Sequence, residues 1–206
     1  NLDTPLCATG TLGCRLRMPD DTVYALSNSH VYAEEGGATV GDLIIQPGQG
    51  DVNCSLFPAD VIGTLFDFTA DDPNGPNLLD AAIAQVTEIN VGMATPCDGY
   101  GVPKTQTVPA TIGMEVMKYG RTTGFTAATV EALGATSVVS GVLFIDQIII
   151  SGVGFSAGGD SGSLIVTRGG RNPVALLFGG NLFTTIANPI DSVLARFGAT
   201  IDGEAP

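Results

Sequence analysis

The stretch Gly158-Gly159-Asp160-Ser161-Gly162-Ser163 lies between two apolar segments and surrounds one serine hydroxyl with glycines. A serine hydroxyl attacks a carbonyl carbon only when a base removes its proton during the attack. It also needs amide N–H groups directed at the oxygen that becomes negatively charged. Glycines beside the serine let the backbone adopt unusual dihedral angles and let a carbonyl group come close. Ser161 is therefore a candidate nucleophile, and a simple tight turn is the alternative interpretation.

The chain contains a single histidine, so only one side chain of this type can serve as the base. His30 follows the apolar segment 23–27, and its side chain has the pKa that suits proton transfer near neutral pH. A lone histidine also fits a structural or an exposed position. If His30 is the base, no other histidine can replace it.

A third group has to orient the imidazole, and Asp80 is the best candidate for this role. It lies in the apolar run LLDAAIA, residues 78–84, where a carboxylate is costly to bury unless another group pairs with it. Most of the 21 acidic residues occur instead in polar turns such as Asp71-Asp72, where solvation explains them. We therefore predict that Asp80 orients His30.

Composition indicates a folded protein made mainly of β-strands. The 206 residues are 44% hydrophobic and include 28 glycines and 12 prolines, and long runs of helix-forming residues are almost absent. The net charge of −13 disfavours nucleic acid and anionic membranes as partners. The sequence contains no apolar run of about 18 residues, the length that would predict insertion into a bilayer.

Ten strands are expected, five on each side of a turn-rich segment at residues 92–109. This pattern predicts a β unit at residues 1–95 that carries His30 and Asp80, a linker at 96–108, and a β unit at 109–206 that carries Ser161. The expected strands are residues 11–17, 22–27, 41–45, 60–68, 81–86, 115–119, 127–133, 142–150, 162–167 and 173–178.

One helix is expected near the end of the chain. Asn188 suits the N-cap, Pro189 the first helical position and Asp191 the positive N-terminal end. Gly198 suits the C-terminal stop. These signals predict a helix of about three turns that packs on the second β unit. Its apolar face consists of Ile190, Val193, Leu194 and Phe197.

Four cysteines, Cys7, Cys14, Cys54 and Cys97, lie in the first half of the chain. Their spacing fits neither a redox motif nor a zinc ribbon, and one histidine cannot complete a mixed metal set, so no metal is expected. Three disulfide pairings and buried free thiols all stay open. The compartment stays open too, with a secreted or extracytoplasmic location slightly favoured. The start at Asn1, without a leader, fits a processed product that has lost a propeptide or N-terminal segment.

Together these segments resemble the motifs of chymotrypsin-like serine peptidases of bacteria. The segments SNSHV (27–31), LDAAIA (79–84) and GGDSGS (158–163) look like the histidine, aspartate and nucleophile boxes of trypsin-like and HtrA-like enzymes, in that family's order. KYGRTTG (118–124) is similar to a strand of the alpha-lytic and streptogrisin group, and FGGN (178–181) to its substrate-binding edge. Residues 187–201 resemble its C-terminal helix. The resemblance covers roughly residues 9–201.

The resemblance implies an all-β fold of two six-stranded antiparallel β-barrels with a C-terminal α-helix. It also implies a serine endopeptidase that acts on a peptide or protein substrate and needs no cofactor. Ser161 would attack the peptide carbonyl, His30 would carry the proton, and Asp80 would orient His30. The backbone N–H groups of Gly159 and Ser161 would bind the oxyanion.

The resemblance assigns supporting residues as well. Asp160 would form a buried ion pair with Arg121 that shapes the oxyanion loop. Phe155 stands where a trypsin-like pocket has an aspartate, and no second histidine could bind glutamate, so an apolar or small first side chain is expected. The substrate-binding residues would be Phe155, Ser156, Gly158, Phe178, Gly179, Gly180 and Thr184, with Thr185 as an alternative to Thr184; Gly179 and Gly180 would pair with the substrate backbone.

Three positions depart from the family pattern. Ser163-Leu164 replaces Gly-Pro after the nucleophile box, and Val31 replaces a bridged cysteine after His30. Phe178 replaces a serine that helps to solvate the catalytic aspartate. Two other functions stay open: a catalytically silent binding module of the same fold, and an esterase that uses the same triad. An α/β-hydrolase is disfavoured because its triad ends in histidine.

Overall fold

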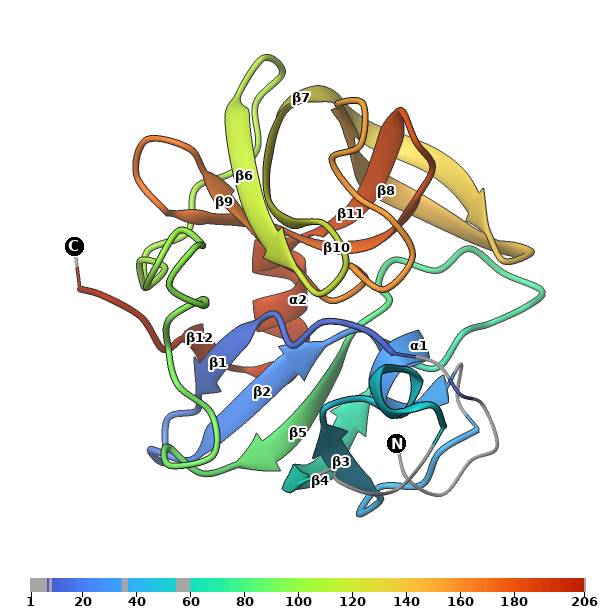
Figure 1. Ribbon diagram of the computed structural model, residues 1–206. Helices are drawn as coiled ribbons and strands as arrows, with labels where there is room; N and C mark the ends of the chain where they lie inside the picture. The colour runs from blue at the N-terminus through green and yellow to red at the C-terminus, as the bar shows by residue number, and fades with distance from the viewer. Residues whose placement is uncertain (1–6, 8, 35–36, 55–59, 206) are drawn as a thin grey trace.

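The computed structural model describes residues 7, 9–34, 37–54 and 60–205, and these form two antiparallel β units with helix α2 packed where they meet (Figure 1). The first unit is a six-stranded sheet in the order β12-β1-β2-β5-β4-β3. Strand β5 lies in its middle, and every residue of β2 is buried. Its strands are β1 (Cys14–Arg17), β2 (Val23–Ser27), β3 (Leu43–Gln46), β4 (Asp60–Phe68), β5 (Ala82–Val86) and β12 (Thr200–Ile201).

The second unit is a closed barrel in the order β10-β11-β8-β7-β6-β9. Its longest strands, β7 and β8, are joined by the two-residue turn Ser140-Gly141, in which both φ angles are positive, at 51° and 86°. Such a turn matches the twist of the strands that it connects. The strands are β6 (Glu115–Gly120), β7 (Gly124–Val139), β8 (Val142–Ser151), β9 (Leu164–Thr167), β10 (Pro173–Gly180) and β11 (Thr184–Pro189).

The predicted fold of two six-stranded antiparallel β-barrels with a C-terminal helix is confirmed, since both units have six antiparallel strands and the second closes into a barrel. All ten predicted strands are present, β4 with the predicted ends and the other nine with shifted ends, and two further strands were missed. Strand β11 ends in Asn188-Pro189, which disguised it as the start of a helix. Strand β12 has only two residues, and Ile201 pairs with Leu16 of β1. The last strand of the chain therefore completes the first sheet, while the predicted unit boundaries stay a prediction.

The C-terminal helix α2 (Ile190–Phe197) is shorter than predicted, with eight residues or about two turns. Gly198 ends it in the left-handed region, at φ 65°, as predicted. The expected N-cap is wrong, because Asn188 lies in β11 and its side chain bonds elsewhere. Val193 and Phe197 pack in a core that both β units share, together with Leu16 and Met117 among others.

The cysteines form one disulfide, between Cys7 and Cys54, and leave two free thiols, at Cys14 and Cys97. Cys14 is buried, and burial raises the pKa of its thiol, with a further contribution from Asp202. Cys97 is exposed. The two thiols therefore differ in access, and Cys14 is also less readily ionised than an ordinary cysteine.

We predict that iodoacetamide modifies one thiol in the native protein and two after unfolding without reductant. Cys97 reacts because it is exposed, whereas burial protects Cys14 until the fold opens. Intact-mass spectrometry counts the added groups, and the Cys97→Ser variant should add none while folded. Native labelling of Cys14 in that variant would contradict the assignment.

Candidate active site

The candidate base and its partner are in direct contact. His30 lies on the short helix α1 (Ser29–Tyr32), which follows β2, and Asp80 lies two residues before the start of β5. The Nδ1 atom of His30 lies 2.5 Å from Oδ2 of Asp80, and the backbone N–H of His30 donates to Oδ1 at 3.1 Å. The Asp80 side chain is 7% exposed and that of His30 is 30% exposed. The carboxylate thus has two donors from one residue and little contact with water.

A buried amide network holds the backbone of Asp80 in place. The N–H of Asp80 donates to Oδ1 of Asn188 at 3.0 Å, and its carbonyl accepts from Nδ2 of Asn28 at 2.8 Å. Asn188 in turn donates to Oε1 of Gln147 at 2.7 Å. Asn188 and Gln147 come from the closed barrel, so the second unit fixes a residue that belongs to the first. Sequence reasoning assigned neither residue to the site, because their complete burial is not visible in the sequence.

Replacing Asn188 with alanine should lower the free energy of unfolding by about 1–3 kcal/mol, because it leaves the Asp80 N–H and the side-chain oxygen of Gln147 unpaired in the interior. The effect is measured by urea unfolding. The matched control, Asn74→Ala, removes an exposed side chain and should change stability by less than about 0.5 kcal/mol. Equal losses in the two variants would refute the network.

Ser161 is brought towards the same region by Thr11, which lies just before β1. The N–H of Thr11 donates to the carbonyl of Ser161 at 2.7 Å. The carbonyl of Thr11 accepts from the hydroxyl of Ser27 at 2.8 Å, and Ser27 lies three residues before His30. One residue thus connects the serine loop to the end of β2. The Ser161 hydroxyl itself donates to the carbonyl of Phe178 at 3.4 Å.

In the loop of residues 158–161 every carbonyl accepts a hydrogen bond, and among the described residues only the N–H of Asp160 donates one, to the carbonyl of Ala157 at 3.0 Å. Within the described part of the chain, neither the N–H of Gly159 nor that of Ser161 donates to another group. Two N–H groups with no competing acceptor can bind a developing oxyanion. The carbonyl donors are Thr122 Oγ1 to Gly158 (2.7 Å), Thr11 Oγ1 to Gly159 (2.8 Å), Ser163 Oγ to Asp160 (2.6 Å) and Thr11 N to Ser161 (2.7 Å).

Two glycines of the motif are required by geometry. Gly159 has φ 97°, and a Cβ atom there would lie 2.4 Å from Oγ1 of Thr122. Gly162 has φ 96°, and a Cβ atom there would lie 2.1 Å from the carbonyl oxygen of Thr11. Both positions combine a left-handed backbone with a close neighbour. The two positions that flank Asp160-Ser161 therefore both require glycine.

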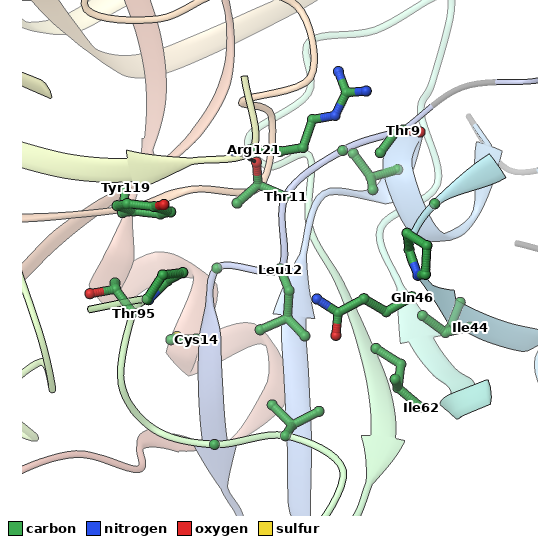
Figure 2. A pocket seen from close by; sticks show the side chains of 18 of the residues that line it. Thr9, Thr11, Leu12, Cys14, Ile44, Gln46, Ile62, Thr95, Tyr119 and Arg121 are labelled. Carbon is green, nitrogen blue, oxygen red and sulfur yellow. Dashed lines mark hydrogen bonds between the residues drawn. The ribbon is translucent and has the colours of Figure 1, made fainter. Parts of the chain in front are cut away.

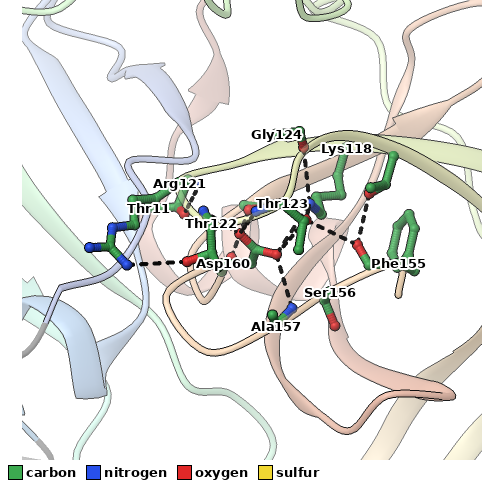
Figure 3. A network of polar contacts seen from close by, with 12 residues as sticks. Thr11, Lys118, Arg121, Thr122, Thr123, Gly124, Phe155, Ser156, Ala157 and Asp160 are labelled. Carbon is green, nitrogen blue, oxygen red and sulfur yellow. Dashed lines mark hydrogen bonds and ion pairs between the residues drawn. The ribbon is translucent and has the colours of Figure 1, made fainter. Parts of the chain in front are cut away.

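The predicted ion pair between Asp160 and Arg121 is wrong, because the partner of Asp160 is Lys118 (Figure 3). Lys118 Nζ lies 3.3 Å from Oδ2 of Asp160, and both side chains are fully buried. Burial alone would raise the pKa of Asp160, but hydrogen bonds from Thr123, Thr122 and Ala157, together with the charge of Lys118, lower it overall. Burial lowers the pKa of Lys118, and Asp160 only partly offsets this.

Arg121 contacts the oxyanion loop by another route. Its Nε atom donates to Asp51 at 2.8 Å, and its NH1 atom donates to Oγ1 of Thr122 at 3.3 Å. Asp51 belongs to the 3-10 helix η2 (Gln49–Val52) of the first unit. Arg121 thus links the two units at the surface. The shorter side chain of Lys118, three residues earlier on β6, reaches the buried carboxylate of Asp160 instead.

The residues predicted to bind substrate lie around the paired ends of β10 and β11. Gly180 pairs with Thr185, and the Thr185 hydroxyl lies 2.6 Å from that of Ser156 in a buried contact. Thr185, not Thr184, therefore meets the segment before Ser161. The rings of Phe155 and Phe178 are buried in the interior, where Lys118 lies over one and Phe144 packs against the other.

A cavity lies elsewhere, between β3 and the segment that leads into β1 (Figure 2). Its volume is about 570 Å³, and neither His30 nor Ser161 lines it. Ile44 and Ile62 point into it from the first sheet, and Leu12 from the segment before β1. The cavity is therefore separate from the candidate residues His30 and Ser161.

Solved bacterial proteases share this fold. Protease A of Thermobifida fusca has a TM-score of 0.67 at 18% identity, over 94% of this chain and 91% of that chain. Cellulomonas bogoriensis chymotrypsin has a TM-score of 0.65 at 17% identity over 93% and 90%, and Nocardiopsis protease 0.65 at 15% over 95% and 98%. No family model matches the sequence. No curated protein sequence matches it either. The predicted resemblance is confirmed as a chymotrypsin-like fold.

Among the described residues, no helix is both long and apolar enough to cross a membrane.

Proposed function

We propose that the chain is a serine endopeptidase, in which Ser161 is the nucleophile, His30 the general base and Asp80 the residue that orients it. The observation that carries the proposal is the contact of 2.5 Å between Nδ1 of His30 and the buried carboxylate of Asp80. A second support is the pair of unbonded N–H groups at Gly159 and Ser161. The fold shared with bacterial proteases is compatible with this chemistry but does not by itself assign it.

In the proposed reaction, Oγ of Ser161 forms a bond to the peptide carbonyl carbon while its proton passes to Nε2 of His30. The carbonyl oxygen becomes an anion that the N–H groups of Gly159 and Ser161 bind. His30 then returns the proton to the amine nitrogen as the C–N bond breaks, which leaves an acyl-enzyme. A water molecule then attacks the carbonyl carbon of the acyl-enzyme while it gives a proton to His30. His30 returns the proton to Oγ of Ser161 as the bond between that oxygen and the acyl group breaks, which releases the acid.

The substrate class follows from the groups around the site. Gly179 and Gly180 at the end of β10 offer backbone groups to an extended peptide, as a further strand would use them. The contact between Ser156 and Thr185 puts two hydroxyls and no charge beside that edge. We expect cleavage after small or apolar side chains, not after lysine, arginine or glutamate.

The test is to incubate a peptide library with the wild-type protein and with the Ser161→Ala variant, and to identify the new termini by mass spectrometry. The proposal predicts cleavage by the wild type alone, with small or apolar residues before the cut. A parallel assay with peptide esters separates an esterase, which would cleave esters but no peptides. Absence of all turnover in the wild type would favour a silent binding module of the same fold.

A further inference from the structure

We infer that Thr122 is a positioning residue for the oxyanion hole, which sets the direction of the Gly159 N–H by holding the carbonyl of the preceding peptide. The inference rests on the proposed function, in which that N–H binds the oxyanion. Thr122 follows β6 and lies outside the three catalytic boxes. Its side chain contacts no residue of the proposed triad among the bonds of the described chain.

The hydroxyl of Thr122 donates to the carbonyl oxygen of Gly158 at 2.7 Å (Figure 3). This carbonyl and the N–H of Gly159 belong to one peptide group. In a trans peptide the C=O and N–H bonds point in opposite directions. Holding the oxygen on Thr122 therefore turns the N–H of Gly159 away from Thr122. Rotation of the peptide would instead present a carbonyl oxygen, which repels an oxyanion.

No other donor among the described residues holds this peptide. The carbonyl of Asp160, which fixes the direction of the Ser161 N–H, accepts from both the hydroxyl and the N–H of Ser163, at 2.6 and 3.0 Å. The carbonyl of Gly158 accepts only from Thr122. Because glycines flank the Gly158–Gly159 peptide, the backbone adds little resistance to its rotation. One half of the oxyanion hole thus depends on a single hydroxyl.

The arrangement around Thr122 favours this use of its hydroxyl. NH1 of Arg121 donates to the Oγ1 atom at 3.3 Å, so the oxygen accepts from a cation while its own hydrogen points to Gly158. Asp51 fixes the Arg121 side chain in turn. A charged donor strengthens a hydrogen bond in a chain of this kind. The contacts of Arg121 therefore act on the loop through Thr122 instead of through Asp160.

The experiment compares Thr122→Val, which keeps the branched shape and loses the hydroxyl, with Thr122→Ser, which keeps the hydroxyl. Removing a whole oxyanion donor costs about 10²–10³ in turnover, so loosening one should lower kcat about 10- to 100-fold for the valine variant. KM should change less than about threefold, because the ground-state carbonyl depends little on this donor. The serine variant should recover most of kcat. Thr129→Val, an exposed threonine on β7, is the matched control.

Crystal structures of the wild type and of Thr122→Val supply a second measurement that needs no turnover. The inference predicts that the Gly158–Gly159 peptide is rotated or disordered in the valine variant and ordered in the serine variant. An unchanged peptide together with unchanged kcat would overturn it, as would equal losses in the valine and serine variants. If the wild type cleaves nothing but the valine variant still rotates the peptide, the proposed function fails and the positioning role stands.

Discussion

Replacing Asp80 with asparagine should lower kcat for peptide cleavage about 10⁴-fold and leave the fold intact. Asparagine can still accept the backbone N–H of His30, so the local backbone contacts are kept. The other side-chain oxygen of Asp80, however, is replaced by an NH2 group. This group faces Nδ1 of the imidazole and can only donate a hydrogen bond, whereas the carboxylate oxygen accepts one. The ring is then held in the wrong tautomer, and a cationic imidazole loses its counterion.

The measurement is kcat and KM at several pH values, with the unfolding midpoint recorded for each variant. Asp146→Asn is the matched control, because Asp146 is exposed and its left-handed backbone suits asparagine. That variant should keep wild-type kcat within a factor of two or so. An Asp80→Asn variant that keeps a tenth or more of wild-type kcat would show that the His30–Asp80 contact does not support catalysis.

Replacing Lys118 with methionine should lower the free energy of unfolding at neutral pH by about 3–5 kcal/mol. The substitution keeps most of the side-chain volume but leaves the charge of Asp160 without its cation in a fully buried place. The carboxylate keeps its bonds from Thr122, Thr123 and Ala157, so the loop is weakened instead of removed. Urea unfolding measures the loss.

The sign of the pH dependence provides the control. Because the pKa of Asp160 in the folded protein lies below its ordinary value of 3.8, the carboxylate stabilises the fold above that pH and loses this effect as the pH falls through the folded pKa. In Lys118→Met the pKa of Asp160 should rise, so the deficit should narrow as acid protonates the group. Adding Asp160→Asn to Lys118→Met should recover part of the loss. A deficit that stays constant down to pH 3 would contradict the pairing.

The three candidate boxes stand out in the sequence because each is a local pattern with a chemical reason. Ser161 is enclosed by glycines that the structure requires at 159 and 162, and Asp80 is a carboxylate in an apolar run. His30 has no rival. Ten of the twelve described strands were also predictable from their apolar segments, whereas β11 and β12 were missed.

The residues that hold Asp80 and Asp160 in place could not be predicted, because they depend on contacts between segments that are distant in the sequence. Lys118 and Arg121 lie three positions apart, and only the path of β6 decides which of them reaches Asp160. Asn188 and Gln147 lie 108 and 67 positions from Asp80. Asn188 reaches Asp80, and Gln147 reaches Asn188, only once the barrel closes beside the first sheet. Asn188 followed by proline also has the local signature of a helix cap, and tertiary packing overrides that signature.

The most direct test of the account is covalent labelling of the folded protein by a fluorophosphonate, followed by intact-mass and peptide mass spectrometry. The reagent reacts with a serine hydroxyl only where a base and an oxyanion hole assist, so it reports the assembled site without knowledge of the substrate. The account predicts one added group, located on Ser161 and lost in the Ser161→Ala and His30→Ala variants. No labelling of the folded wild-type protein, or labelling of a different serine, would contradict it.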